Sequence, residues 1–380
     1  MISMFLSRSQ DELMLILDLQ SSVVRGSLVH ARENDIPIVL FTRSIGIPYK
    51  PKARSAYVVK LALKAVSQVI HEVLKELHVK SAAADMPSSI AKVHYVLSSP
   101  WIISQAKTIS VSFDKNTMVN RSSVLKLIEN ERAKLSSNSL SDMRVIEEKV
   151  FDVLLNGYSV NSWNGRETKE MSVSFVVSVA GDKTIQRLID VCDVVVRRSR
   201  IQFHSSLFLQ HAAIQKIMPD RSSYALIHVH GELTDVAIVR ERACVFFGSF
   251  PFGINTAVRS IAQGAMIENL TAESLLDVSS QNQFDAAHAK KENSLVQNMS
   301  HHWISELKKL ISQNLSETIL PSNAIISARL HEDFFAKSLK TAFSGVAVES
   351  LKIESILPFA SFDAHTEPLR LTGLYAIAIV

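Results

Sequence analysis

The sequence predicts a mixed α/β fold, and three observations carry this prediction. Two segments, residues 13–28 and 224–239, each have apolar residues at both ends and polar residues in the middle, as two buried strands joined by a short turn would. Residues 56–77 carry apolar side chains at helical spacing. The chain has 380 residues, which is long enough for two domains or one large bilobed domain.

The region that follows the first hairpin continues this alternation. We expect a third strand at 37–42, then the helix at 56–77, and then a small α+β unit bounded by polar connections. The elements expected in that unit are strands at 91–97, 108–113, 143–154 and 158–162 and a helix at 124–135.

The remaining elements lie on either side of the second hairpin. The strand at 171–180, the amphipathic helix at 181–193, and a helix entered through His204 and Ser205 should precede it. The elements expected after it are a strand at 244–252, helices at 254–266 and 303–315, and the apolar segment 323–330. The alternation of strands and helices along the chain is typical of an α/β protein.

Composition excludes several classes of protein. Hydrophobic residues make up 47% and charged residues 21%, and Lys+Arg 41 against Asp+Glu 37 gives a net charge of only +4. That balance gives no support to nucleic-acid binding. Cys192 and Cys244 lie far apart without C-x-x-C spacing, so neither a disulfide framework nor a zinc site is predicted. No apolar run reaches the length of a transmembrane helix, and we expect a reducing cytoplasm.

The turn of the second hairpin, HGELTD at residues 230–235, is the most informative motif. It resembles the second phosphate loop of the actin-like ATPase superfamily, D-I-G-G-G-T-T-D-I-A in bacterial FtsA and its pilus relative PilM. Gly231, Thr234 and Asp235 match. The departures are His228 for the first Asp, His230 and Glu232 for glycines, and Leu233 for a threonine. Taken alone, the segment also suits an ordinary β-hairpin turn.

These departures weaken a phosphate site for physical reasons. Glycines let backbone N–H groups approach phosphate oxygens without a Cβ in the way. A carboxylate at Glu232 would in addition face the polyphosphate with like charge.

The turn of the first hairpin lies in LDLQSSVVRG, residues 17–26. It resembles the superfamily's first phosphate loop, L-D-I-G-S-S-x-V-R-G, with Gln20 in the place of a glycine. The resemblance implies that Asp18 is the magnesium-side carboxylate and that Ser21 and Ser22 are phosphate-facing hydroxyls. Asp18 and Asp235 would be metal residues only if a magnesium nucleotide binds. The alternative is a buried strand that ends in a polar turn.

Two further motifs imply a nucleoside side of the cleft. Ala272 and Glu273 match the start of the family's A-E-x-x-K helix, although Leu276 has taken the place of the lysine. In the third loop, I-x-L-T-G-G in the family, Ser327 replaces the threonine, and Ala328 and Arg329 replace both glycines. The resemblance assigns Glu273 and Ser327 to nucleotide binding, and Arg329 would crowd the purine.

His204 is the one candidate catalytic residue. It matches a glutamine in FtsA and a glutamate in chaperones of the DnaK type, and both help to position the attacking water in those families. An imidazole can do acid–base work at neutral pH. The alternative is a local hydrogen-bonding residue at the start of a helix.

The resemblance covers nearly the whole chain in the right order, so it predicts a bilobed actin-like ATPase fold with an inserted SHS2-type α+β module. The expected boundaries are residues 1–89 and 171–220 for the first lobe, 90–170 for the module and 221–361 for the second lobe. Residues 362–380 should form a terminal element that packs back on the core.

Each nucleotide motif has lost at least one residue of its usual set, which favours a scaffold over an enzyme. We expect an FtsA-like scaffold of bacterial cell division or membrane-associated assembly, a pseudo-ATPase with weakened or lost binding of ATP and magnesium. The alternatives are a PilM-like cytoplasmic component of type IV pilus assembly and, from another class, an active ATPase or sugar kinase. The expected partner is a division filament protein or a membrane pilus protein. Self-assembly stays open, no nucleic acid is expected, and contact with the cell membrane would come through the partner.

Overall fold

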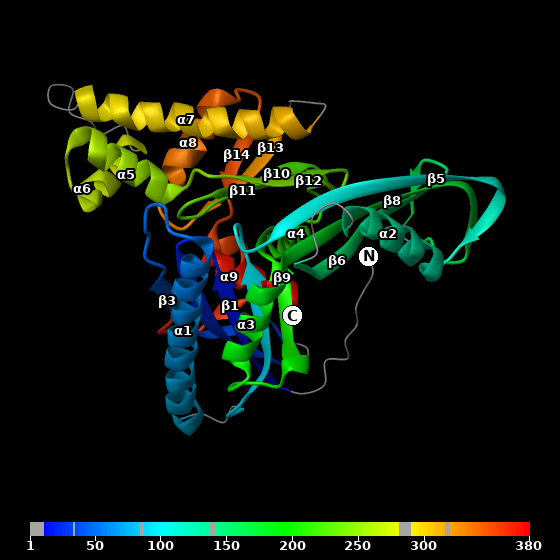
Figure 1. Ribbon diagram of the computed structural model, residues 1–380, viewed down its shortest axis with the longest axis horizontal. Helices are drawn as coiled ribbons and strands as arrows, with labels where there is room; N and C mark the ends of the chain where they lie inside the picture. The colour runs from blue at the N-terminus through cyan, green and yellow to red at the C-terminus, as the bar shows by residue number, and fades with distance from the viewer. Residues whose placement is uncertain are drawn as a thin grey trace.

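The computed structural model describes residues 11–32, 35–83, 87–136, 142–160, 162–280, 290–315 and 320–380. Within these ranges the chain forms two lobes, each built on its own sheet, and a third, smaller sheet (Figure 1). Figure 1 shows the first lobe below, the second lobe above and the smaller sheet extending to one side. The mixed α/β class predicted from the sequence is confirmed.

The two lobes share one strand topology. The first-lobe sheet has the order β15-β3-β2-β1-β4-β9, and the second has the order β12-β11-β10-β13-β14. In each, three consecutive antiparallel strands are followed by two strands parallel to the first. The first-lobe strands are β1 (Glu12–Leu19), β2 (Val23–Ala31), β3 (Ile38–Gly46), β4 (Ile90–Leu97), β9 (Ile201–Ser205) and β15 (Ser361–Phe362). The second-lobe strands are β10 (Tyr224–Val229), β11 (Thr234–Arg240), β12 (Ala243–Phe250), β13 (Asn323–Ala328) and β14 (Ala347–Ser350).

Helices cover both faces of the first-lobe sheet, which is why β1 is apolar on both sides. Leu15 and Leu17 pack with α1 (Ser55–Ala83) and α3 (Asp182–Cys192), whereas Met14 and Ile16 pack with α4 (Ser206–Ile217) and α9 (Arg370–Ile379). A Cβ at Gly26 of β2 would lie 2.2 Å from Val69 Cγ1 of α1. This glycine therefore allows the long helix to lie directly on the sheet.

The second lobe is covered on its outer face by four helices and on its inner face by α4. Leu207 and Ile214 of α4 join Tyr224 and Leu226 of β10 in one cluster. Since α4 also packs with the first lobe, it is a shared layer between the two lobes. The outer helices are α5 (Ile254–Ala265), α6 (Asn269–Ser280), α7 (Lys290–Asn314) and α8 (Glu332–Ala342). Two short 3-10 helices lie elsewhere in the chain, η1 (Arg198–Arg200) just before β9 and η2 (Ile353–Ser355) between β14 and β15.

The smaller sheet is antiparallel, with the order β5-β8-β6-β7, and α2 packs on it through Val124 and Ile128. Its elements are β5 (Ile103–Val119), α2 (Arg121–Ser136), β6 (Met143–Leu155), β7 (Tyr158–Ser159) and β8 (Arg166–Gly181). Its assignment as an SHS2 module stays a prediction.

Two expectations about particular strands were wrong. β4, expected in the inserted module, pairs with β1 and β9 in the first-lobe sheet. Residues 171–180, expected as a first-lobe strand, are the end of β8 in the smaller sheet. A short apolar run looks the same in sequence whichever sheet it joins, so both errors concern pairing partners. The helix expected to be entered through His204 and Ser205 is confirmed: it begins at Ser206 with Ser205 as its N-cap, and His204 lies near the end of β9.

None of the helices in the described part of the chain combines the length and apolarity that crossing a lipid bilayer requires.

Candidate functional site between the two hairpin turns

The turns of the β1–β2 and β10–β11 hairpins have the same backbone hydrogen bond. Gln20 N donates to Val23 O at 3.0 Å, and His230 N donates to Leu233 O at 3.0 Å. Each turn follows the first strand of its lobe. The two turns are thus equivalent points of the duplicated topology.

The two turns contact each other directly across the lobes. Glu232 N donates to Ser21 Oγ at 2.9 Å, and the same hydroxyl lies 3.0 Å from His230 Nδ1. A Cβ added at Gly231 would lie 1.8 Å from Ser22 Oγ. Gly231 is therefore required by the close approach of the other lobe's turn.

Asp18 lies just below the first turn and is buried with a cation. It accepts hydrogen bonds from Arg25 Nη1 at 2.7 Å and from Gln20 Nε2 at 2.9 Å, both through Oδ2. Burial raises the pKa of Asp18, and the charge of Arg25 and the hydrogen bond from Gln20 offset only part of that effect. The carboxyl group is held by the protein's own side chains.

Asp235 lies below the second turn and takes its partners from two elements. Its Oδ2 accepts from Ser99 N at 3.1 Å and lies 3.1 Å from His230 Nε2. Burial alone would raise the pKa of Asp235, but the charge of His230 and the hydrogen bonds from His230 and Ser99 hold it below its usual value. Asp235 thus ties the second turn to the loop after β4.

His228 connects the second hairpin to the helices between the lobes. Its Nδ1 lies 3.1 Å from Gln210 Nε2 of α4, and Gln210 Oε1 accepts from Ser327 Oγ of β13 at 3.1 Å. Gln210 Nε2 also donates to Ser206 Oγ, which lies 2.8 Å from the Tyr375 hydroxyl of α9. Burial lowers the pKa of His228 to about 3, so the ring is neutral.

Glu232 is held by a contact that the sequence analysis missed. Arg259 of α5 donates to both carboxylate oxygens, at 3.0 and 2.6 Å, and Asn255 Nδ2 donates to Oε1 at 3.0 Å. The guanidinium of Arg259 also lies over the ring of Tyr49, 3.8 Å from the ring centroid. Tyr49 belongs to the first-lobe loop between β3 and α1. The i, i+4 spacing of Asn255 and Arg259 signals one shared helix face, but nothing in it identifies Glu232 or Tyr49 as the partners.

The structure brings only some of the predicted nucleotide residues together. Asp18, Ser21, Ser22, Gly231 and Asp235 line the contact between the turns, and Ser327 joins them through Gln210.

The other predicted residues lie elsewhere. Thr234 faces the second-lobe core, where it donates to Phe252 O at 2.7 Å and accepts from Trp303 Nε1 at 3.0 Å. Glu273 is half-buried on α6, and Leu276 of the same helix is in the core.

His204 lies in a separate cluster. Its Nε2 is 3.1 Å from His94 Nδ1, and its Nδ1 is 3.8 Å from Glu147 Oε1 of β6. Burial lowers the pKa of His94 to about 3. These contacts join β4, β9 and the smaller sheet. In the described ranges, no group of three or more His, Cys, Asp or Glu residues is arranged to hold a metal ion.

The duplicated sheets and the two facing turns define the fold of the actin-like ATPase superfamily. No protein-family model and no curated protein matches the sequence. Solved structures do match along nearly the whole chain. A chain of the PilM–PilN type IV pilus biogenesis complex has a TM-score of 0.62 and 12% identity, with 96% of this chain and 96% of that chain covered.

Two further similar structures have lower scores. The ethanolamine utilization protein EutJ from Carboxydothermus hydrogenoformans has a TM-score of 0.47 at 12% identity, over 98% of this chain and 90% of that one. The activator of 2-hydroxyisocaproyl-CoA dehydratase from Clostridium difficile, with bound ADPNP, has a TM-score of 0.41 and 10% identity. The match covers 97% of this chain and 94% of that chain. The match to the PilM–PilN chain and the duplicated sheets together show that the protein has the actin-like ATPase fold.

Proposed function

We propose that this protein is a scaffold with the actin-like fold that binds a protein partner at the inner face of the cell membrane, and that its own side chains hold the lobes together where an ATPase would use nucleotide. The observation that carries the proposal is the contact between the two turns. Glu232 N and Ser21 Oγ are groups that phosphate loops direct at phosphate, and here they bond each other at 2.9 Å.

The residues around the turns fit magnesium ATP poorly. Phosphate oxygens between the turns would have to displace the Ser21 hydroxyl and would face the carboxylate of Glu232 with like charge. On the metal side, Asp18 Oδ2 already accepts from Arg25 and Gln20, and only Oδ1 of this carboxylate has no partner among the described residues. Magnesium would compete with a guanidinium for that carboxylate.

The energetic cost of opening the turns supports the same proposal. Each hydrogen bond lost between them costs about 1 kcal/mol, and Gly231 would have to move away from Ser22. Separating the buried Asp18–Arg25 pair would cost about 3–5 kcal/mol more. We therefore expect an ATP dissociation constant above about 1 mM, which corresponds to about −4 kcal/mol of binding free energy.

A partner surface is available outside this cleft. β5 is an edge strand of the smaller sheet. Its first residues lie beside β12, and its side chains alternate between exposed and half-buried over most of its length. An exposed edge can accept an extended peptide by backbone hydrogen bonding. The PilM–PilN complex is an assembly of such a fold with a pilus protein, and we propose by analogy a cytoplasmic segment of a membrane pilus protein as the partner. An FtsA-like role would replace it with a division filament protein.

Calorimetry with ATP, with and without magnesium, tests the loss of nucleotide binding. The wild-type chain should give no heat below about 1 mM ATP. The double variant His230→Gly, Glu232→Gly restores two family glycines and removes the like charge, and it should bind more tightly. Micromolar binding by the wild-type chain would contradict the proposal.

Peptide binding tests the scaffold role separately. Fluorescently labelled peptides from the cytoplasmic segment of a PilN-type protein and from the tail of a division filament protein serve as probes. One of them should bind the wild-type chain and the Asp18→Asn variant equally, because Asp18 is buried with Arg25 in the first-lobe sheet and is not part of β5. If Asp18→Asn abolished binding in a folded protein, a nucleotide-gated mechanism would be the better account.

A further inference from the structure

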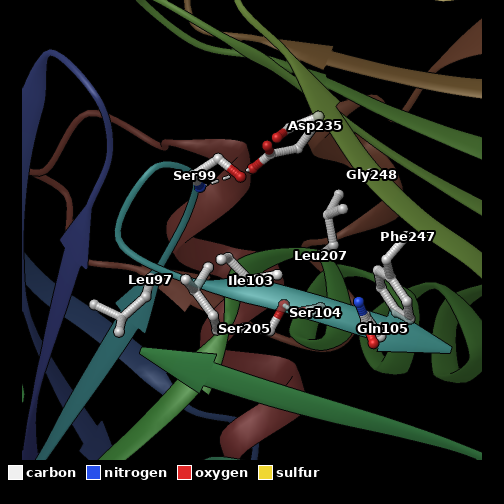
Figure 2. Close-up of a pocket in the computed structure, with 12 residues that line it drawn as sticks. Leu97, Ser99, Ile103, Ser104, Gln105, Ser205, Leu207, Asp235, Phe247 and Gly248 are labelled. Atoms are coloured by element: carbon white, nitrogen blue, oxygen red, sulfur yellow. Dashed lines mark hydrogen bonds between the residues drawn. The ribbon is translucent and has the colours of Figure 1, made fainter. Parts of the chain in front are cut away.

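A hollow of about 190 Å³ lies beside Asp235, on the side facing the smaller sheet (Figure 2). Its walls come from the loop after β4, the start of β5, the β9–α4 junction and the strands β11 and β12. Figure 2 shows Asp235 and Ser99 at one end and Ser104, Ser205 and Gln105 on the opposite side. The hollow shares Asp235 with the contact between the two turns, but Ser21, Ser22 and Gly231 do not line it.

The carboxylate of Asp235 has one oxygen without a partner. Oδ2 is occupied by Ser99 N and His230 Nε2, but Oδ1 has no hydrogen-bond partner among the described residues. The residue is only 4% exposed. A buried charged acceptor without a partner destabilises the folded protein, because it has lost its hydrogen bonds to water. A ligand that donates to Oδ1 would remove that destabilisation.

The lining of the hollow is partly polar and includes no cationic side chain, whereas His230 lies outside it, 3.1 Å from Asp235 Oδ2. The hydroxyls of Ser104, Ser205 and Ser249 line the hollow, and Ser249 is the register partner of Asp235, so both side chains point to the same face of the sheet. The twelve lining residues include one carboxylate and no Lys, Arg or His. Behind the wall, buried Glu147 accepts from Ser205 N at 3.2 Å. A second carboxylate, 3.8 Å from His204 Nδ1, therefore lies behind the same wall.

Apolar side chains form the rest of the lining. They are Leu97, Ile102, Ile103, Leu207 and Phe247. A ligand that fits must therefore join a cationic hydrogen-bond donor to a short aliphatic stem.

We propose that this hollow binds an alkylammonium group, with the ammonium at Asp235 Oδ1 and the stem along the apolar wall. An ammonium suits the site better than a guanidinium, because only one carboxylate oxygen is free and a bidentate pair cannot form. The group has two chemical sources, a lysine side chain of a protein partner and a small free amine. The inference goes beyond the scaffold role and does not depend on whether ATP binds.

Amide NMR titration of the full chain at neutral pH tests the site with n-butylamine, 1-butanol and butyrate. Butylammonium should shift the amide signals of Ser99, Ser104 and Ser249 with a dissociation constant at least tenfold lower than that of butanol, and butyrate should not bind. Asp235→Asn should abolish the preference for the cation. Asp220→Asn, in the exposed turn before β10, should keep it. Equal binding of butanol and butylamine by the wild-type chain would overturn the proposal.

A second variant covers the case in which Asp235→Asn does not fold. Ser249 is exposed at the rim of the hollow, so Ser249→Phe should close the hollow and remove butylammonium binding while Asp235 itself is kept. Retained binding would overturn the proposal. The capped peptide Ala-Lys-Ala distinguishes the sources: binding tighter than that of butylamine identifies a lysine side chain, and binding of butylamine alone identifies a small amine. Failure of both probes would again contradict the site.

Discussion

The two central hairpins share a backbone and differ in charge. In β1–β2, Asp18 lies opposite Arg25, whereas at the equivalent positions of β10–β11, His228 lies opposite Asp235. The first hairpin neutralises its carboxylate internally, through an ion pair of 2.7 Å. In the second hairpin, Asp235 depends on Ser99 from the other lobe and on His230 from its own turn. Two hairpins of one topology thus differ in how their carboxylates are stabilised. The first hairpin supplies its own counter-charge, whereas the second also takes a hydrogen bond from the other lobe.

The largest expected effect is on the first hairpin. Asp18→Ala should lower the free energy of unfolding by about 4 kcal/mol, because it leaves the Arg25 guanidinium buried without a carboxylate. The double variant Asp18→Leu, Arg25→Met should recover most of the loss. Urea denaturation measures both, and a loss below about 1 kcal/mol for Asp18→Ala would show that the pair is not buried in solution.

The next effect concerns the contact between the turns. Gly231→Ala should cost about 3 kcal/mol, because its Cβ would lie 1.8 Å from Ser22 Oγ and 2.3 Å from Ser22 Cβ. Gly345→Ala is the matched control, since a Cβ there would meet nothing within 4 Å. Thermal unfolding compares the two. Equal melting temperatures would mean that the turns are apart in solution.

The third expectation uses pH to examine the second hairpin. Burial lowers the pKa of His228 from 6.5 to about 3. As pH falls below 6.5, His228 therefore binds a proton in the unfolded chain but stays neutral in the folded chain. Stability should therefore fall, by about 2 kcal/mol from this residue between pH 8 and pH 5. Stability curves of the wild type and His228→Gln at both pH values measure it. The difference isolates His228, because Asp18, whose pKa burial raises, acts with the opposite sign in both chains. Identical pH dependence would refute the effect.

The smallest effect is expected at the exposed bridge between the lobes. Tyr49→Ala removes the ring under Arg259 and should cost about 0.5–1 kcal/mol. Tyr57 stacks with Lys50 inside the first lobe, so Tyr57→Ala is the control. Spin labels at the exposed positions Lys64 and Lys309, on α1 and α7, should report a broader interlobe distance only for the Tyr49 variant. An unchanged distance distribution in the Tyr49 variant would show that the Tyr49–Arg259 contact does not hold the two lobes together.

Local patterns predicted the hairpins and the long helix. The strands at 13–28 and 224–239 and the helix at 56–77 each carry their own periodicity, and the structure has all three. The pairing of β4 with β9 joins residues 108 positions apart, as at Val93 and Ile201, and that of β8 with β5 joins residues up to 76 positions apart, as at Ile103 and Val179. No local period encodes such a choice.

The candidate site, too, was only partly predictable from the sequence. The turn motifs identified Ser21 and Gly231, but the bond from Glu232 N to Ser21 joins residues 211 positions apart, and no short window of sequence shows it. Thr234 is different. It alternates with Val236 and Ile238 on the core side of β11, so strand periodicity alone could have excluded it from the cleft.

The strand β15 and the helix α9 carry a consequence for the order of folding during synthesis. Residues 224–350 contain every strand of the second-lobe sheet, so this lobe can assemble as one continuous stretch. The first lobe is different, because β15 pairs with β3 and α9 packs on β1 across more than 300 residues of sequence. The lobe that emerges first from the ribosome is therefore completed last, and β3 keeps an open edge for a chaperone to protect until then.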